Sequence, residues 1–238
     1  MTKNSWWLAF LFSLPSLAVF SQTDSTKQRN TTRYLGIQAN QLIRQIFNFS
    51  NSNTPIDNPY LITYSVNSKK TGVGFNAGLG FSVNEFSDGD PSNKRETKIN
   101  NLSFRLGVEK KSMIGKRWMV SWGFDIVHDN LKNETSNIQN NDPTNPAIRF
   151  VSTTTNTTSS WGLGPRVTLN FQLTSRILLG TEANYYYRSG SIKGTASTSN
   201  TFFNGTGLTT NISNTESSSD FTKFQFNLPA VIYVILKF

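Results

Sequence analysis

The sequence predicts an all-β protein, an antiparallel up-and-down transmembrane β-barrel of about eight strands with long external loops. Three observations lead to this fold class. Apolar and polar residues alternate with a period of two, which is the spacing of a strand with two unlike faces. The connections between these stretches are short and long in turn. The composition is rich in Asn, Ser, Thr and Gly and holds no cysteine, so stability must come from the strands and not from disulfides.

Residues 1–21 predict a secretory signal peptide. Lys3 precedes an apolar run from Trp6 to Phe20, and cleavage is expected after Ser21. The alternative is a transmembrane helix, which is disfavoured because the run is shorter than the roughly 20 residues of a span and contains Pro15. The exported chain then consists of a flexible N-terminus, residues 22–33, and a single barrel domain, residues 34–238.

Strands are expected, in order, near residues 34–47, 59–66, 72–85, 97–110, 117–129, 160–172, 176–188 and 221–238. The last strand alternates best, with Phe224 and Phe226 on one face and Lys223 and Gln225 on the other. The first is broken in its parity from Gln41, so its end could also be a short helix. Pro165 and Pro229 each predict a bulge or kink, because proline removes a ladder donor.

Short turns are expected near residues 67–71, 111–116 and 172–175, and long loops near 48–58, 86–96, 130–160 and 189–220. This alternation is typical of outer-membrane barrels, which have short turns on one side and long loops on the other. Strand-like pieces at 147–155 and 201–210 leave two alternatives open. Either the barrel extends beyond the bilayer or the strand count is ten.

A soluble sandwich or a lipocalin would also alternate, so the charges decide which face is inside. The polar faces hold residues of both signs, which can pair in a narrow lumen. A lipid-facing Arg would cost about 2–4 kcal/mol at the midplane, which imposes the register. The expected lumen network comprises Arg105, Glu109, Asp125, Arg166, Glu182, Arg188 and Lys223. Aromatic residues are expected in two girdles, with Trp118 and Phe171 on the turn side and Trp161, Tyr185, Tyr187 and Phe224 on the loop side.

With its signal peptide, its amphipathic strands and its closing stretch from Ala230 to Phe238, the chain resembles the family of small bacterial outer-membrane β-barrels. The resemblance implies a location in the outer membrane and contact with outer-membrane lipid. It also implies that the barrel assembly machinery recognises the last strand, with Phe238 as the key position. Some barrels of this size are lipid-modifying enzymes that use a His, a Ser and an acid.

Little in the sequence indicates catalysis or a cofactor. His128 is the single histidine and has outward parity, whereas Asp125 and Asp129 have inward parity, so a catalytic role is disfavoured. The glycine-rich stretch 72–78 resembles a dinucleotide loop only superficially, because no helix follows it. Lys and Arg are scattered despite the net charge of +9, which argues against nucleic acid.

We therefore expect a non-enzymatic membrane protein with a plugged lumen and a structural or surface-interaction role. No metal or cofactor site is expected, and no surface ligand is indicated. A small pore or solute-uptake barrel is the alternative, and a lipid-modifying enzyme is a weaker one.

Overall fold

The computed structural model describes residues 30–39, 60–90, 92–140, 148–227 and 231–238. The predicted signal peptide, most of the segment 22–33, the stretch 41–47, the predicted loop 48–58 and Pro229 lie outside these residues. Among the described residues, no helix is long and apolar enough to cross a membrane.

The described part of the chain forms nine strands. They are β1 (Thr31–Gln38), β2 (Ile62–Ser68), β3 (Val73–Gly89), β4 (Asn93–Ile114), β5 (Trp118–Asn140), β6 (Arg149–Gln172), β7 (Ile177–Phe203), β8 (Leu208–Asn227) and β9 (Tyr233–Lys237). The first strand begins three residues before its predicted start at Tyr34.

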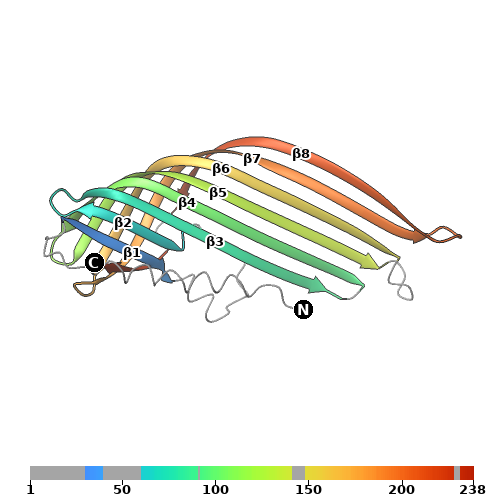
Figure 1. Ribbon diagram of the computed structural model, residues 1–238, viewed down its shortest axis with the longest axis horizontal. Helices are drawn as coiled ribbons and strands as arrows, with labels where there is room; N and C mark the ends of the chain where they lie inside the picture. Colours follow the sequence, from blue (N-terminus) through green and yellow to red (C-terminus); the bar gives the residue numbers. More distant parts are fainter. Residues whose placement is uncertain (1–29, 40–59, 91, 141–147, 228–230) are drawn as a thin grey trace, which may run out of the picture. The chain divides into compact units, whose positions relative to one another are not determined.

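The strands of the unit from Thr31 to Phe238 close into a ring of antiparallel neighbours (Figure 1). Each strand from β1 to β7 pairs with the next along the chain. Strand β9 pairs with both β7 and β1 and so completes the ring. Strand β8 pairs with residues 184–203 of β7, so β8 and β9 together correspond to the predicted eighth strand. The all-β, antiparallel, up-and-down class is confirmed.

The last strand changes register between β8 and β9. Asn227 pairs with Asn184, and Tyr233 pairs with Gly180, so six residues of this strand oppose four of β7. An irregularity near Pro229 was predicted, and the registers on its two sides differ by two residues. Because two is even, the apolar face stays on the same side of the sheet.

The bulge predicted at Pro165 is wrong. The register of β6 against β7 is the same before and after it, with Leu163 opposite Tyr187 and Arg166 opposite Asn184. Pairing with β5 continues through Pro165 without interruption. Only the pairs of Gly164 and Pro165 with β7 are missing, as expected where proline offers no N–H.

The long loops predicted at 86–96, 130–160 and 189–220 are mostly strand. Strands β3 to β8 continue past the ring as an open six-stranded sheet, which we call the extension (residues 83–89, 93–101, 130–140, 149–159, 189–203 and 208–222; Figure 1). The described parts of the pieces 147–155 and 201–210 prolong β6, β7 and β8 and add no strands to the ring, so the ten-strand alternative is wrong. Thr, Ser and Asn supply cross-strand hydrogen bonds there, such as Thr201 with Thr210 at 2.9 Å.

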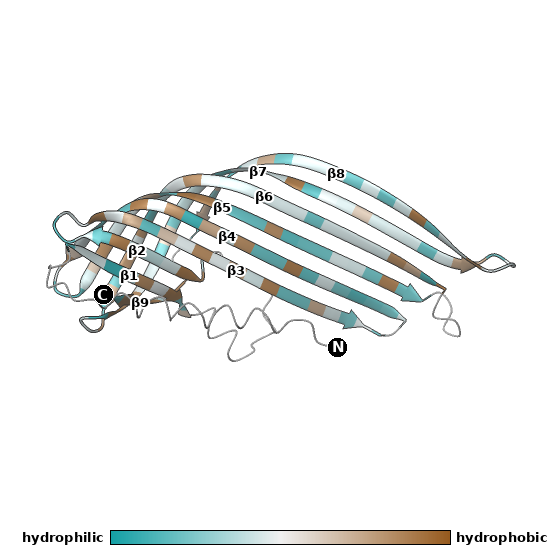
Figure 2. Ribbon diagram, in the orientation of Figure 1, coloured by the Kyte–Doolittle hydropathy of each residue, from teal (hydrophilic) through white to brown (hydrophobic). Residues whose placement is uncertain are grey.

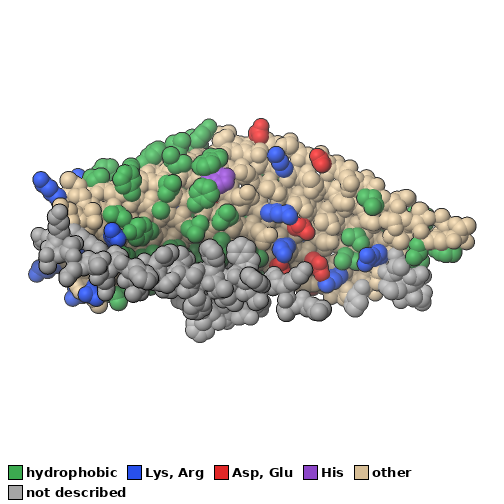
Figure 3. All heavy atoms as spheres, viewed as in Figure 1, with side chains coloured by type: hydrophobic (Ala, Val, Ile, Leu, Met, Phe, Trp, Pro, Cys, Tyr) green, Lys and Arg blue, Asp and Glu red, His purple; other side chains and the backbone are tan. Residues whose placement is uncertain are grey.

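The two faces of the ring are the reverse of those of a soluble protein. The outer face exposes large apolar side chains on strands β2 to β9, with Phe75 at 72% and Trp122 at 59% exposure, and the apolar positions alternate along the strands in Figure 2. Among the described residues, sixteen buried residues are polar or charged and nine are apolar. The predicted assignment of polar residues to the interior is therefore confirmed, and the outer apolar residues form a belt around the ring (Figure 3).

Candidate functional site: a charged cluster inside the ring

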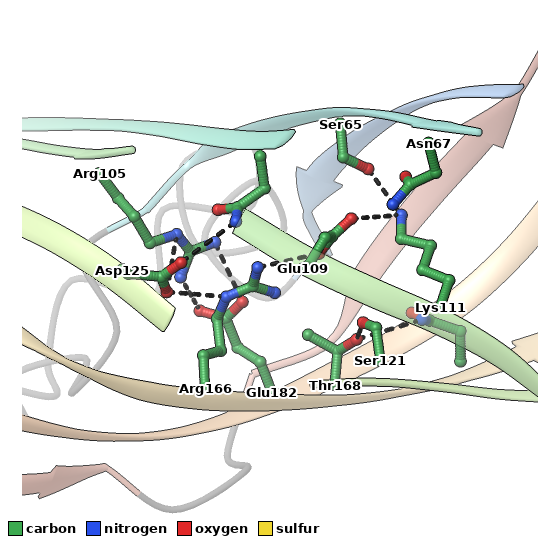
Figure 4. Close-up of polar contacts among 12 residues, drawn as sticks. Ser65, Asn67, Arg105, Glu109, Lys111, Ser121, Asp125, Arg166, Thr168 and Glu182 are labelled. Atoms are coloured by element: carbon green, nitrogen blue, oxygen red, sulfur yellow. Dashed lines mark hydrogen bonds and ion pairs between the residues drawn. The ribbon is translucent and has the colours of Figure 1, made fainter. Parts of the chain in front are cut away.

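The centre of the ring holds a cluster of ion pairs from β4 to β7 (Figure 4). Arg105 binds Glu182 with both ends of its guanidinium group, at 2.8 Å from Nη1 to Oε1 and 3.2 Å from Nη2 to Oε2. Arg166 donates to Asp125 at 2.8 Å and to Glu109 at 2.9 Å. Such two-pronged pairing suits the planar fork of arginine, and it ties four strands together across the interior.

The Asp125 carboxylate accepts hydrogen bonds from three strands. Its Oδ2 accepts from Tyr186 Oη at 2.9 Å as well as from Arg166, and its Oδ1 accepts from Asn76 Nδ2 at 3.1 Å. Arg105 Nε lies 3.8 Å from the same Oδ2. Asp125 is fully buried, so these donors replace the water that the carboxylate loses on burial.

Lys111 extends the cluster toward the short turns, and sequence reasoning placed it in a turn. Its ammonium lies 3.0 Å from Glu109 Oε1, donates to Ser65 Oγ at 2.6 Å and sits 3.7 Å from the centre of the Tyr34 ring. The alternation of Arg105, Gly107 and Glu109 continued by one step would have found Lys111, because it has the same parity.

The structure brings five of the seven predicted network residues together: Arg105, Glu109, Asp125, Arg166 and Glu182. Arg188 is also buried but forms its own ion pair with Asp129, a partner that sequence reasoning did not assign. The strands are tilted relative to the ring axis. In a row of paired residues, each residue therefore lies further along this axis than its partner on the previous strand. Arg188 approaches the central cluster through Tyr186, whose ring centre lies 5.7 Å from the Arg188 guanidinium carbon.

The prediction for Lys223 is wrong. Its side chain is exposed, and it lies over the Phe221 ring at 5.5 Å with no acidic partner among the described residues. Lys223 pairs in register with Arg188, beyond the buried cluster. The two-residue alternation predicted the correct side of the sheet for Lys223. Its position along the ring axis depends on the tilt of the strands and could not be predicted from the sequence.

Two small apolar clusters lie inside the ring besides these charges. One consists of Tyr34, Met119 and Leu178, and the other of Tyr60, Val127 and Tyr186. Arg105 stacks on the Tyr60 ring at 4.4 Å, so the second cluster lies directly against the charges. The cavity beside these groups has a volume of about 40 Å³, which is room for one or two waters. Side chains fill the space around it, as an eight-stranded barrel allows.

His128 lies on the outer face among aromatic rings. Its imidazole centroid is 4.9 Å from that of Phe104 and 4.4 Å from that of Trp161. Asp125 and Asp129 lie on the other side of the strand, as their parity predicts. The described residues also contain no group of three His, Cys, Asp or Glu that could hold a metal ion.

Aromatic contacts occur at both ends of the apolar belt, where the two girdles were expected. Trp118 packs on Phe171 at 4.8 Å near the short turns. At the other end, Phe224 packs on Tyr185 at 5.7 Å and on Tyr187 at 5.2 Å.

The extension carries a different surface from the belt. Its outer face has ion pairs along neighbouring strands, such as Lys98 with Glu85 at 2.5 Å and Lys132 with Glu134 at 3.1 Å. The hydrogen bond to Glu85 raises the pKa of the Lys98 ammonium. The face continuous with the ring interior carries polar residues such as Thr97, Asn133 and Thr135, together with the facing pair Asp88 and Arg95.

Together these features define a ring of antiparallel strands that is apolar outside and charged inside, closed by its own side chains and prolonged by a polar sheet. The chain belongs to a family of unknown function (DUF6850), whose model matches residues 16–214. Among curated proteins, none matches the chain.

Proposed function

We propose that this chain is an integral protein of a bacterial outer membrane, in which the belt contacts lipid and the extension stands outside the bilayer. The single observation that carries the proposal is the exposure of large apolar side chains on strands β2 to β9 of the ring. In water such a surface would be far larger than the apolar patches that soluble monomers leave exposed. On β3 the belt runs from Val73 to Phe81, which matches the roughly 9–11 residues of a transmembrane strand.

The filled interior supports a structural or surface-interaction role and not transport. A pore needs a continuous path for water, whereas the cavity beside Arg105 and Arg166 has a volume of only about 40 Å³. The extension offers polar side chains on both faces and is the part suited to contacts outside the membrane. We assign no catalytic residue, because the carboxylates of the cluster are already engaged by Arg and Lys.

Labelling of single cysteines tests this proposal cleanly, since the chain has none of its own. Ile126→Cys places a thiol in the belt, and Thr155→Cys places one on the extension. In intact cells that export the protein, a membrane-impermeant maleimide should label Thr155→Cys and leave Ile126→Cys unlabelled until the membrane is dissolved and the protein unfolded. Equal labelling of both variants in intact cells would refute membrane insertion.

A further inference from the structure

The charged side chains of the described residues fall into three groups. Inside the ring, four cations face four acids, including the pair of Arg188 and Asp129. On the extension and its hairpins, seven cations are matched by seven acids. The third group lies at the turn end, which we define as the connections 69–72, 115–117 and 173–176 with the strand ends beside them.

The exposed charged side chains of the turn end are all cations. Its only acidic side chain among the described residues is Glu109, which is buried and engaged in the interior cluster. The net charge of +8 on the described residues therefore resides entirely at this end. On the visible face in Figure 3, acidic side chains appear only over the extension. Six cations of the turn end are exposed, namely Lys69, Lys70, Lys110, Lys116, Arg117 and Arg176, and Arg33 and Lys237 are half-buried.

These cations border the apolar belt. The Arg117 carbonyl accepts from the Gln172 backbone at 2.8 Å, and Arg117 precedes Trp118, whose ring packs on Phe171. Across the turn 173–176, the Lys237 backbone N–H donates to the Arg176 carbonyl at 2.7 Å. The charges thus follow the rim at the aromatic edge of the belt. Long Lys and Arg stems can lie along apolar surface there while their heads reach a charged layer.

We infer that the turn end binds the phosphate groups of anionic phospholipids. This inference rests on the proposed membrane location and adds which lipid the rim prefers. Unopposed Lys and Arg next to an apolar belt are attracted to a negatively charged headgroup layer. The extension, with equal numbers of both signs, offers no comparable attraction.

Two tryptophans on the outer face make the preference measurable at each end of the belt. Trp118 lies at the turn end and Trp161 at the opposite end, with 47% and 57% exposure. Two full-length variants would each keep one of them and carry Phe at the other four Trp positions. Each variant is reconstituted into vesicles of phosphatidylcholine that contain a fraction of brominated phosphatidylcholine or brominated phosphatidylglycerol, and quenching of its fluorescence is measured.

For Trp118 we expect the relative affinity for brominated phosphatidylglycerol to exceed that for brominated phosphatidylcholine several-fold at low salt. For Trp161 we expect a ratio near one. Raising the salt to about 1 M should bring the Trp118 ratio close to one, since the Debye length falls to about 3 Å. All cations of the turn end are unchanged in both tryptophan variants, so this comparison requires no charge substitution.

Charge variants test which cations cause the lipid preference measured at Trp118. Lys116→Gln/Arg117→Gln/Arg176→Gln in the Trp118 background should reduce the ratio toward one. Lys94→Gln/Arg95→Gln/Lys132→Gln removes the same charge from the extension and should leave the ratio unchanged.

The two proposals fail in different ways. If the protein inserts and Trp118 is quenched equally by both lipids at low salt, or if Trp161 shows the same preference, the lipid inference is overturned and the membrane location stands. If neither tryptophan is quenched by any brominated lipid, the protein has not inserted and the proposed function itself is refuted.

Discussion

The Asp125 carboxylate shows how single residues hold the interior together. It accepts hydrogen bonds from Asn76, Arg166 and Tyr186, which come from three different strands. Burial of an unpaired carboxylate would be very costly, so each donor is needed to keep the charge inside. The six charges of the central cluster balance, with Arg105, Lys111 and Arg166 against Glu109, Asp125 and Glu182.

Asp125→Asn keeps the shape of the side chain and removes its charge. Arg166 and Arg105 then lose part of their compensation inside the ring. We expect the free energy of unfolding to fall by about 3–5 kcal/mol, the usual cost of breaking a buried ion pair. Urea unfolding in lipid vesicles, followed by tryptophan fluorescence, measures this change.

Lys223→Gln is the matched control, because Lys223 has inward parity but lies outside the cluster. It should leave the unfolding midpoint unchanged. A loss as large as that of Asp125→Asn would place Lys223 in the network after all.

Gly107 is required for a close approach and not for an unusual backbone angle. A Cβ atom at this position would lie 2.0 Å from Asp125 Oδ1 and 2.6 Å from the Phe124 carbonyl oxygen. We therefore expect Gly107→Ala to destabilise the protein by about 1–3 kcal/mol, as overpacking does. At Gly207 a Cβ would meet no atom within 4 Å, so Gly207→Ala should be neutral in the same unfolding assay. Equal midpoints for the two variants would contradict the packing of the interior.

At the scale of strands, the sequence was informative wherever the two faces of a strand differ. The ring strands contrast apolar with charged or glycine positions, so their existence, order and inward faces were predictable. The extension has polar residues on both faces, and the contrast disappears. The stretches 130–140 and 189–203 consequently resembled loops, although Thr and β-branched residues favour strands. Only the length of the two predicted loops indicated that they contain strands, because connections of about 30 residues without secondary structure are uncommon.

Pairing partners were less predictable than faces. Parity places Arg105, Lys111 and Lys223 on the same side, but which acid each one meets depends on the stagger of tilted strands around the ring. That stagger is a property of all the pairings together. It explains why Lys223 was assigned to the network wrongly and why Asp129 was missed. Lys111 was missed because it was placed in a turn.

The β7–β8 hairpin of the extension should be dispensable for the ring. Residues 197–203 and 208–214 pair only with each other and with β6, so their removal brings Ala196 and Thr215 next to the turn 204–207. We expect this shortened protein to keep its unfolding midpoint and its membrane location, because no belt or cluster residue is removed. Membrane fractionation together with urea unfolding checks this. Loss of the protein from the membrane fraction would show that the extension is needed for folding or assembly.

At the scale of the whole molecule, the turn end, the belt and the extension follow one another along the ring axis. A cationic rim borders an apolar belt, and the belt gives way to a polar sheet whose charges balance. The filled interior lets the ring hold its shape without an aqueous channel. Such an order suits a protein that crosses a lipid layer with a defined orientation, as the proposed function requires.

The most direct test of this account is the gel migration of the protein from isolated outer membranes, compared between boiled and unboiled samples. Closed strand rings in membranes resist detergent until heated and then change their migration. We predict that the protein is found in the outer-membrane fraction and that its band shifts on boiling. A protein recovered in the soluble periplasmic fraction without a shift would contradict the account, because the apolar belt could not then face lipid.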